Sequence, residues 1–190
     1  MVLSETIRGN SAARWGIRLL ASVALSLALV SCGLFADPSP PCPLVSIMDQ
    51  AKQVTLYRPG PGRDLTDVTY QVEIRDLAYE CDYDFDDIGN RVTVGFNILF
   101  VAKRGPAAEQ DQIVIPYFVA VADPDKNVLT KKQFFVTLEF EGNAVRAQKV
   151  EELVQIIPYP RDDDGSDYKS FIGVQLTSGQ LEDIRRASGS

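Results

Sequence analysis

The sequence predicts an all-β domain, an immunoglobulin-like antiparallel β-sandwich of about seven strands followed by one short C-terminal helix. Three observations favour this fold. Apolar and polar residues alternate in successive runs, residues typical of turns separate those runs, and only the last segment has a helical pattern. A small β-barrel is the alternative, because it has the same strand pattern. The runs cover about 150 residues, enough for one domain with a hydrophobic core.

The first two segments of the domain differ in how clearly their residue patterns predict secondary structure. Residues 44–57 are ambiguous, because the first part fits a helical stripe and the second part fits a strand. Residues 68–85 read as a strand whose phase slips once: apolar residues lie on even positions up to Ile74 and on odd positions from Leu77. In a regular strand, this one-residue slip would turn the apolar side chains after it to the outer face of the sheet. We therefore expect a β-bulge near Arg75–Asp76, or a crossing between sheets.

Five further runs complete the strand pattern: residues 92–102, 113–122, 128–140, 150–157 and 168–176. The run 92–102 is partly apolar on both faces, which is typical of a central strand. Pro116 must lie at an edge or a bulge, because proline has no N–H for the hydrogen-bond ladder. Thr177 and Gln180 have the spacing of a capping box, which predicts a helix from Ser178 to about Arg186.

The N-terminal 31 residues have the order of a secretory signal, with arginines before an apolar run from Leu19 to Val30. That run is shorter than the roughly 20 apolar residues of a membrane-spanning helix. It leads into Leu29-Val30-Ser31-Cys32-Gly33, which is similar to the lipobox of bacterial lipoproteins. The similarity implies that Cys32 carries lipid and begins the mature protein. The alternative is a secreted protein cleaved after Ala36.

We therefore expect three segments: a signal peptide at 1–31, a lipidated tether at 32–41 and a single β-sandwich domain at 42–190. The tether is short and rich in proline, and at about 3.1 Å per residue it reaches on the order of 30 Å. In lipoproteins generally, an aspartate after the lipidated cysteine favours the inner membrane. Gly33 in that position favours the outer membrane, with the domain facing the periplasm.

Two cysteines, Cys42 and Cys81, are left after lipidation of Cys32, and we expect them to form a disulfide because the periplasm is oxidising. Two buried thiols are the alternative. The chain contains no histidine, so these cysteines lack the further ligands that a tetrahedral metal site needs.

The charge and the missing histidine exclude several functions. The net charge is −7, and removal of the signal makes the chain more acidic. Such a surface repels nucleic acid and anionic headgroups, so we expect no nucleic-acid partner and membrane attachment through lipid. Without histidine the commonest general base is missing, and we expect no enzyme and no cofactor. Ser166 and Lys169 match the Ser-x-x-Lys of penicillin-binding proteins, but they straddle a turn and a strand start.

Two acidic segments raise the hypothesis of calcium binding, because carboxylates that end in a loop can supply some of the six or more oxygens required. The candidate ligands are Asp82, Asp84 and Asp86 in the first segment, and Asp162 and Asp164 in the second. Neither segment has the spacing of an EF-hand. Solvated surface carboxylates are the alternative.

Four short segments are similar to segments of a group of uncharacterised lipoproteins from proteobacteria. They are Asp64-Leu65-Thr66-Asp67-Val68, Cys81-Asp82-Tyr83-Asp84, Pro116-Tyr117-Phe118-Val119-Ala120-Val121 and Gly173-Val174-Gln175-Leu176-Thr177. The resemblance covers most of the mature chain. It implies export and a sandwich fold, and it supplies no site residues.

The sequence favours a non-catalytic, lipid-anchored module that presents strand edges or loops to a protein partner in the cell envelope. The second hypothesis is a binding module for a cation, a small ligand or a cell-wall glycan, which would use the acidic loops or a strip of exposed tyrosines. The candidates for that strip are Tyr57, Tyr117, Tyr159 and Tyr168, with core packing as the alternative for each. An enzyme that uses carboxylates alone is the third hypothesis.

Overall fold

The computed structural model describes residues 39–85 and 89–188, with side chains described up to residue 186. Contacts divide the chain after Ser39, and the description concerns the second unit, Pro40–Ser190. The strands are β1 (Leu44–Ile47), β2 (Gln53–Tyr57), β3 (Val68–Phe85), β4 (Asn90–Arg104), β5 (Gln112–Ala122), β6 (Val128–Glu139), β7 (Arg146–Tyr159) and β8 (Lys169–Val174). The helical elements are the 3-10 turns η1 (Asp49–Ala51) and η2 (Leu65–Asp67), and the helix α2 (Ser178–Ser188).

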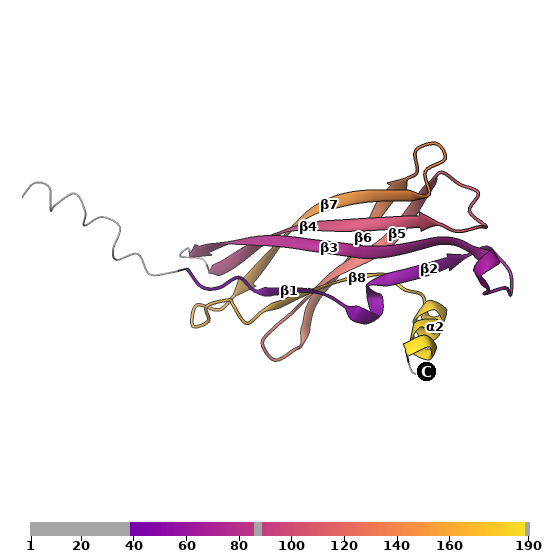
Figure 1. Cartoon of the computed structure of the whole chain (residues 1–190). Coiled ribbons are helices and arrows are strands. Elements are labelled where there is room, and N and C mark those ends of the chain that lie inside the picture. The colour runs from indigo at the N-terminus through magenta and orange to yellow at the C-terminus, as the bar shows by residue number, and fades with distance from the viewer. Residues whose placement is uncertain (1–38, 86–88, 189–190) are drawn as a thin grey trace, which may run out of the picture. The chain divides into compact units, whose positions relative to one another are not determined.

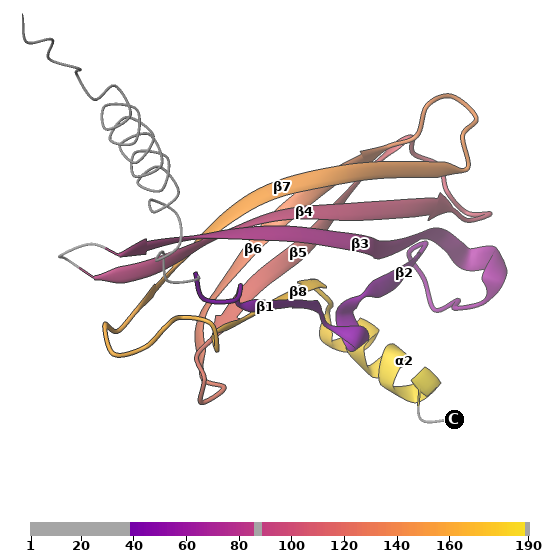
Figure 2. The same cartoon turned by 60° about the vertical axis from the view of Figure 1, so that its left-hand side comes forward.

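The strands form two four-stranded sheets, with the orders β1-β8-β5-β6 and β2-β3-β4-β7. All neighbouring strands are antiparallel except β1 and β8, which are parallel. Figures 1 and 2 show β3, β4 and β7 running together in one layer, with β5, β6 and β8 in the other. The two sheets are not joined into a closed barrel. The prediction of a β-sandwich with one C-terminal helix is therefore confirmed.

The strand count differs from the prediction because the ambiguous segment 44–57 forms two short strands. β1 belongs to one sheet and β2 to the other, and η1 turns the chain between them. The predicted bulge in β3 is confirmed. Ile74 pairs with Phe100 and Asp76 pairs with Leu99, so Arg75 is the extra residue.

The core lies between the two sheets and is made by the inward faces of their strands. The ring of Tyr117 on β5 lies 4.9 Å from Phe100 and 5.6 Å from Phe134, measured between centroids. β5 is an inner strand, but Pro116 lies just beyond the last β5–β8 pair, Tyr117 with Val174. The carbonyl of Pro116 still accepts from the N–H of Gln175 at 2.8 Å, so the missing N–H falls where the β5–β8 pairing ends and not at an edge of the sheet.

A smaller apolar cluster lies on the outer face of the β1-β8-β5-β6 sheet, where Ala51 of η1 packs with Phe118 and Ala120. The approach is close at Gly173, because a Cβ built there would lie 2.6 Å from the Cβ of Ala51. Beyond β8, the predicted capping box starts α2: the Thr177 N–H donates to Oε1 of Gln180 at 2.8 Å.

The strand registers place the connections at two ends of the sandwich. At the end where the chain enters the domain, Phe85 pairs with Asn90, Asn90 with Tyr159, and Ala122 with Lys169. We call this the entry end, and among the described residues it comprises 40–43, 84–85, 89–90, 123–127 and 160–168. The opposite end, or far end, comprises residues 58–67, 105–111 and 140–145.

Candidate functional site

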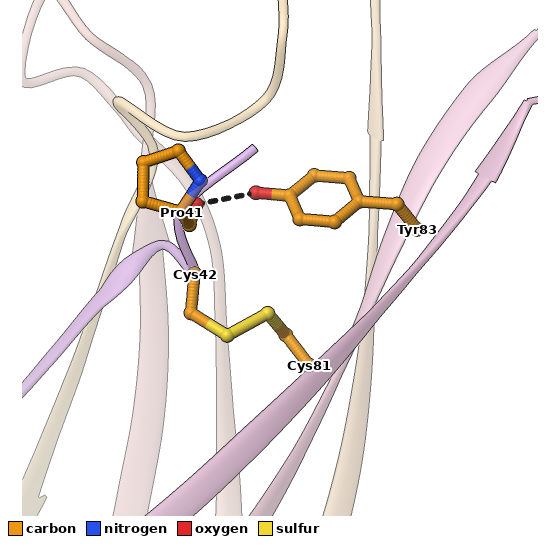
Figure 3. Close-up of a disulfide and its surroundings, with 4 residues drawn as sticks. All are labelled: Pro41, Cys42, Cys81 and Tyr83. Carbon is orange, nitrogen blue, oxygen red and sulfur yellow. Dashed lines mark hydrogen bonds between the residues drawn. A yellow bond between two sulfur atoms is a disulfide. The ribbon is translucent and has the colours of Figure 1, made fainter. Parts of the chain in front are cut away.

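A disulfide fixes the incoming chain to the entry end. Cys42 is bonded to Cys81 of β3, with the two Cα atoms 5.8 Å apart (Figure 3). Two residues further along the same face of β3, the hydroxyl of Tyr83 donates a hydrogen bond of 2.7 Å to the main-chain carbonyl of Pro41. The predicted disulfide is confirmed. Because of the bulge at Arg75, Cys81 and Tyr83 both face the interior side of the sheet.

Aromatic side chains pack around Tyr83, next to the disulfide. The ring of Tyr83 lies 6.0 Å from Phe85 and 6.3 Å from Tyr159, and Tyr159 lies 6.3 Å from Tyr168. Burial, together with the smaller effects of the neighbouring Tyr159 and Asp164, raises the pKa of Tyr83 to about 12. Burial also raises the pKa of Tyr159 and of Tyr168. These phenols therefore stay neutral at ordinary pH; all three pack together, and Tyr83 also donates the hydrogen bond to Pro41.

The two acidic segments do reach the same end: Asp84 lies next to the last residue of β3, and Asp162 and Asp164 lie in the connection between β7 and β8. Their carboxylates, however, bind local donors. Asp84 forms an ion pair with Arg91. The hydroxyl and N–H of Ser166 donate to Asp164 at 2.6 and 2.8 Å, and these bonds hold the pKa of Asp164 below its usual value.

The remaining calcium candidates are not brought together. Asp82 and Asp162 are exposed, and Asp86 lies outside the described residues. Within residues 39–85 and 89–188, no three His, Cys, Asp or Glu side chains are grouped so that they could hold a metal ion. The positions of Asp82, Asp84, Asp162 and Asp164 thus agree with the alternative of solvated or locally hydrogen-bonded surface carboxylates.

The hypothesis of an exposed tyrosine strip is wrong. Tyr117, Tyr159 and Tyr168 are buried in the core, and Tyr57 is half-buried, with the guanidinium of Arg63 5.2 Å from its ring centre. The strip fails because Tyr117 and Tyr159 lie on the inward faces of β5 and β7, and Tyr168, just before β8, packs into the same core.

The Ser-x-x-Lys match has no catalytic geometry. Ser166 lies in the connection before β8 and donates to Asp164, while Lys169 is the first residue of β8. The mechanism requires the lysine one helical turn after the serine, and no helix spans these two residues.

The far end has an open hollow of about 760 Å³ beside β2. Its lining includes Tyr57, Tyr70 and one carboxylate, Glu109. The hydroxyl of Tyr70 donates to the carbonyl of Gln110 at 2.6 Å and accepts from its N–H at 3.1 Å, so it is fully engaged in holding the loop. A histidine-free hydrolase would need paired carboxylates, and the described lining of this hollow does not supply a pair.

No family model, no curated protein and no solved structure matches the chain. The resemblance to proteobacterial lipoproteins therefore stays a prediction. Among the described residues, no helix has both the length and the apolar character needed to cross a membrane.

Sequence reasoning missed the hydrogen bond between Tyr83 and Pro41. The alternation in β3 put Tyr83 on the same face as Cys81. It therefore contained the signal that Tyr83 lies near the partner of Cys81, but it could not identify the carbonyl that accepts the bond.

Proposed function

We propose that the protein is a lipoprotein of the cell envelope, attached to the membrane through lipid on Cys32, and that its β-sandwich is a non-catalytic interaction module. The observation that carries the proposal is the disulfide between Cys42 and Cys81 at the entry end. A disulfide is typical of exported proteins, because cytosolic thiols are kept reduced. It supports the interpretation of residues 1–31 as an export signal.

The position of Cys42 limits the distance between the lipid and the domain. Cys42 is only ten residues after Cys32, and a fully extended chain of that length spans about 35 Å. The disulfide and the hydrogen bond from Tyr83 to Pro41 then fix the chain to the domain. The proposed anchor would therefore hold the sandwich close to the bilayer.

The charge of the entry end supports attachment by lipid. Aspartates outnumber basic residues in the connections at this end, which include residues 123–127 and 160–168. Carboxylates near an anionic bilayer are repelled over roughly a Debye length, about 8 Å at physiological salt. Electrostatic attraction would not hold this end on a membrane, whereas acyl chains would.

Substitution of the lipidated cysteine tests the proposal. In cells labelled with palmitate, Cys32→Ser should lose the label and move from the membrane pellet to the soluble fraction. The matched control is the double variant Cys42→Ser/Cys81→Ser, which lacks the other two cysteines and should keep both the label and the membrane attachment. A labelled, membrane-bound Cys32→Ser protein would overturn the proposal.

We further propose, because Gly33 follows Cys32, that the protein lies in the outer membrane, and a second variant tests this location. Gly33→Asp should move the protein from the outer-membrane fraction to the inner-membrane fraction of a density gradient, without loss of the palmitate label. If the unsubstituted protein is already in the inner membrane, the proposed location is wrong although the anchor is not.

A further inference from the structure

β7 is a long, regular and open edge strand. It pairs with β4 from Arg146 to Tyr159 without a register shift, and no strand of the described chain pairs with its other side. The other edges are less suited to pairing. β1 and β2 have four and five residues, and β6 has a register shift and exposes Lys131 and Lys132. Natural sheets protect their edges by such shortness, irregularity and charge.

The main-chain groups that point out of this edge belong to the even-numbered residues. In an antiparallel strand, alternate residues direct their N–H and C=O toward one neighbour. The odd-numbered Val145 accepts from the N–H of Arg104, just before β7, so the odd residues face β4. In agreement, Pro158 has no N–H to leave unpaired at the edge, and the carbonyl of Ile156 is reached by the side chain of Gln155 at 2.8 Å.

The side chains on this edge are partly apolar and partly charged. Val150, Val154 and Ile156 lie on the outer face of the sheet and are 50%, 71% and 54% exposed. Lys149 and Glu151 lie on the other face. Neither forms an ion pair within the described part of the chain.

We propose that β7 pairs with β7 of a second copy of this chain, antiparallel, about a two-fold axis at Val150. The two sheets then form one continuous eight-stranded sheet. In this register Val150 is opposite Val150, and Lys149 is opposite Glu151 on both sides of the axis. Opposite charges in cross-strand positions stabilise a sheet, and like charges destabilise it.

The two alternative registers nearest to this one place like charges opposite each other. A side chain must pair with one on the same face, so the register can change only in steps that move the axis by one residue. An axis at residue 149 places Lys149 opposite Lys149, and an axis at residue 151 places Glu151 opposite Glu151. The chosen register also pairs Gln148 with Glu152. Between residues 146 and 154 it forms about ten main-chain hydrogen bonds.

Such an interface is isologous, so each copy contributes the same surface and the assembly stops at two. It identifies a second copy as the partner for the interaction role proposed above. It does not depend on lipid at Cys32, and the following experiments therefore succeed or fail independently of the palmitate labelling.

Crosslinking tests the register. Directly opposed residues of a hydrogen-bonded antiparallel pair have Cα atoms about 5.5 Å apart, within the range of about 4.4–6.8 Å that a disulfide spans. Val150→Cys, in a purified full chain that also carries Cys32→Ser so that no other free thiol is present, should form a covalent dimer on mild oxidation. The matched control is Val154→Cys, which is more exposed, but whose two copies would be about 27 Å apart. Equal crosslinking of both variants, or crosslinking of Val154→Cys alone, would overturn the proposal.

Charge reversal tests the pairing independently of cysteine chemistry. Sedimentation velocity of the full chain should show a dimer, and Lys149→Glu or Glu151→Lys should each raise its dissociation constant at least tenfold. The double variant Lys149→Glu/Glu151→Lys should restore the dimer. Lys132→Glu, on the edge strand β6, should leave the constant unchanged. Thermal melting monitors folding of each variant. A monomeric unsubstituted chain, or failure of the folded double variant to recover, would refute the pairing.

Discussion

Reduction of the Cys42–Cys81 disulfide should lower the free energy of unfolding by about 4 kcal/mol. The two cysteines are 39 residues apart, and the chain-entropy model gives this value for a loop of that length. The effect acts on the unfolded chain, because the bond closes residues 42–81 into a loop and so reduces the conformational entropy of that state. In the folded protein, the β1–β8 pairing and the bond from Tyr83 to Pro41 still hold the incoming chain. We therefore expect the reduced protein to fold.

The assay is thermal unfolding of the purified protein with and without reductant. For a domain of this size, 1 kcal/mol corresponds to about 2–4 °C in Tm, so reduction should lower Tm by about 8–16 °C. The double variant Cys42→Ser/Cys81→Ser is the control, and its Tm should match that of the reduced protein and not respond to reductant.

If alkylation and mass spectrometry show that the bond is fully reduced while Tm falls by less than about 2 °C, the loop does not contribute the expected entropy. The same conclusion follows if the double variant is as stable as the oxidised protein.

Three further predictions concern single side chains. Tyr117→Phe should raise the free energy of unfolding by about 1 kcal/mol, since it removes a buried hydroxyl without a partner in the described chain, whereas Tyr70→Phe should lower it by about 1 kcal/mol by removing a 2.6 Å hydrogen bond. Urea denaturation that gives both changes the same sign would contradict this. Gly173→Ala should cost about 1–3 kcal/mol because its Cβ would meet another Cβ at 2.6 Å, while Gly95→Ala, with its nearest contact at 3.6 Å, should be nearly neutral in the same assay. Between neutral pH and pH 10 the buried tyrosines should leave stability unchanged, and stability should then fall between pH 10 and about pH 12. The reason is that the raised pKa values of Tyr83 and Tyr117 make the unfolded chain lose these protons first. Denaturation curves that are unchanged across this window would refute the prediction.

The features that follow from period-two alternation could be predicted from the sequence. The phase slip at Arg75 indicated the bulge, and the phase after it put Cys81 on the inner face, where it meets Cys42. The capping box of α2 could also be predicted, because Thr177 and Gln180 are only three residues apart in the sequence. These features depend on local order, and local order is what a single sequence contains.

The arrangement of the strands could not be predicted in the same way. Nothing in the residues of β1 indicates that it pairs parallel to β8, since the choice depends on which other edge is free. The run that became β5 is apolar on both faces, so its pattern did not decide that Tyr117 points inward. Likewise, apolar residues occupy both parities of β7, and only the structure shows that Val150 and Val154 face outward.

The candidate calcium ligands show a further limit of prediction from sequence. The spacing of Asp162 and Asp164 indicated acidic loops, and the structure does place them in a connection at the entry end. Whether carboxylates converge on one point depends on the local turn. At Asp164 the donors of Ser166 occupy the carboxylate. That competition is settled by backbone geometry, which residue types alone do not specify.

The disulfide also decides where a mechanical load on the N-terminal segment acts. A pull transmitted through Cys42 passes by the covalent bond into Cys81, and so it bypasses β1, whose four residues would otherwise peel from β8 one pair at a time. β3 has 18 residues and lies between β2 and β4. Its hydrogen bonds are perpendicular to the strand, so a force along β3 loads many of them together in shear. The longest strand of the sandwich, and not the shortest, therefore bears the strain.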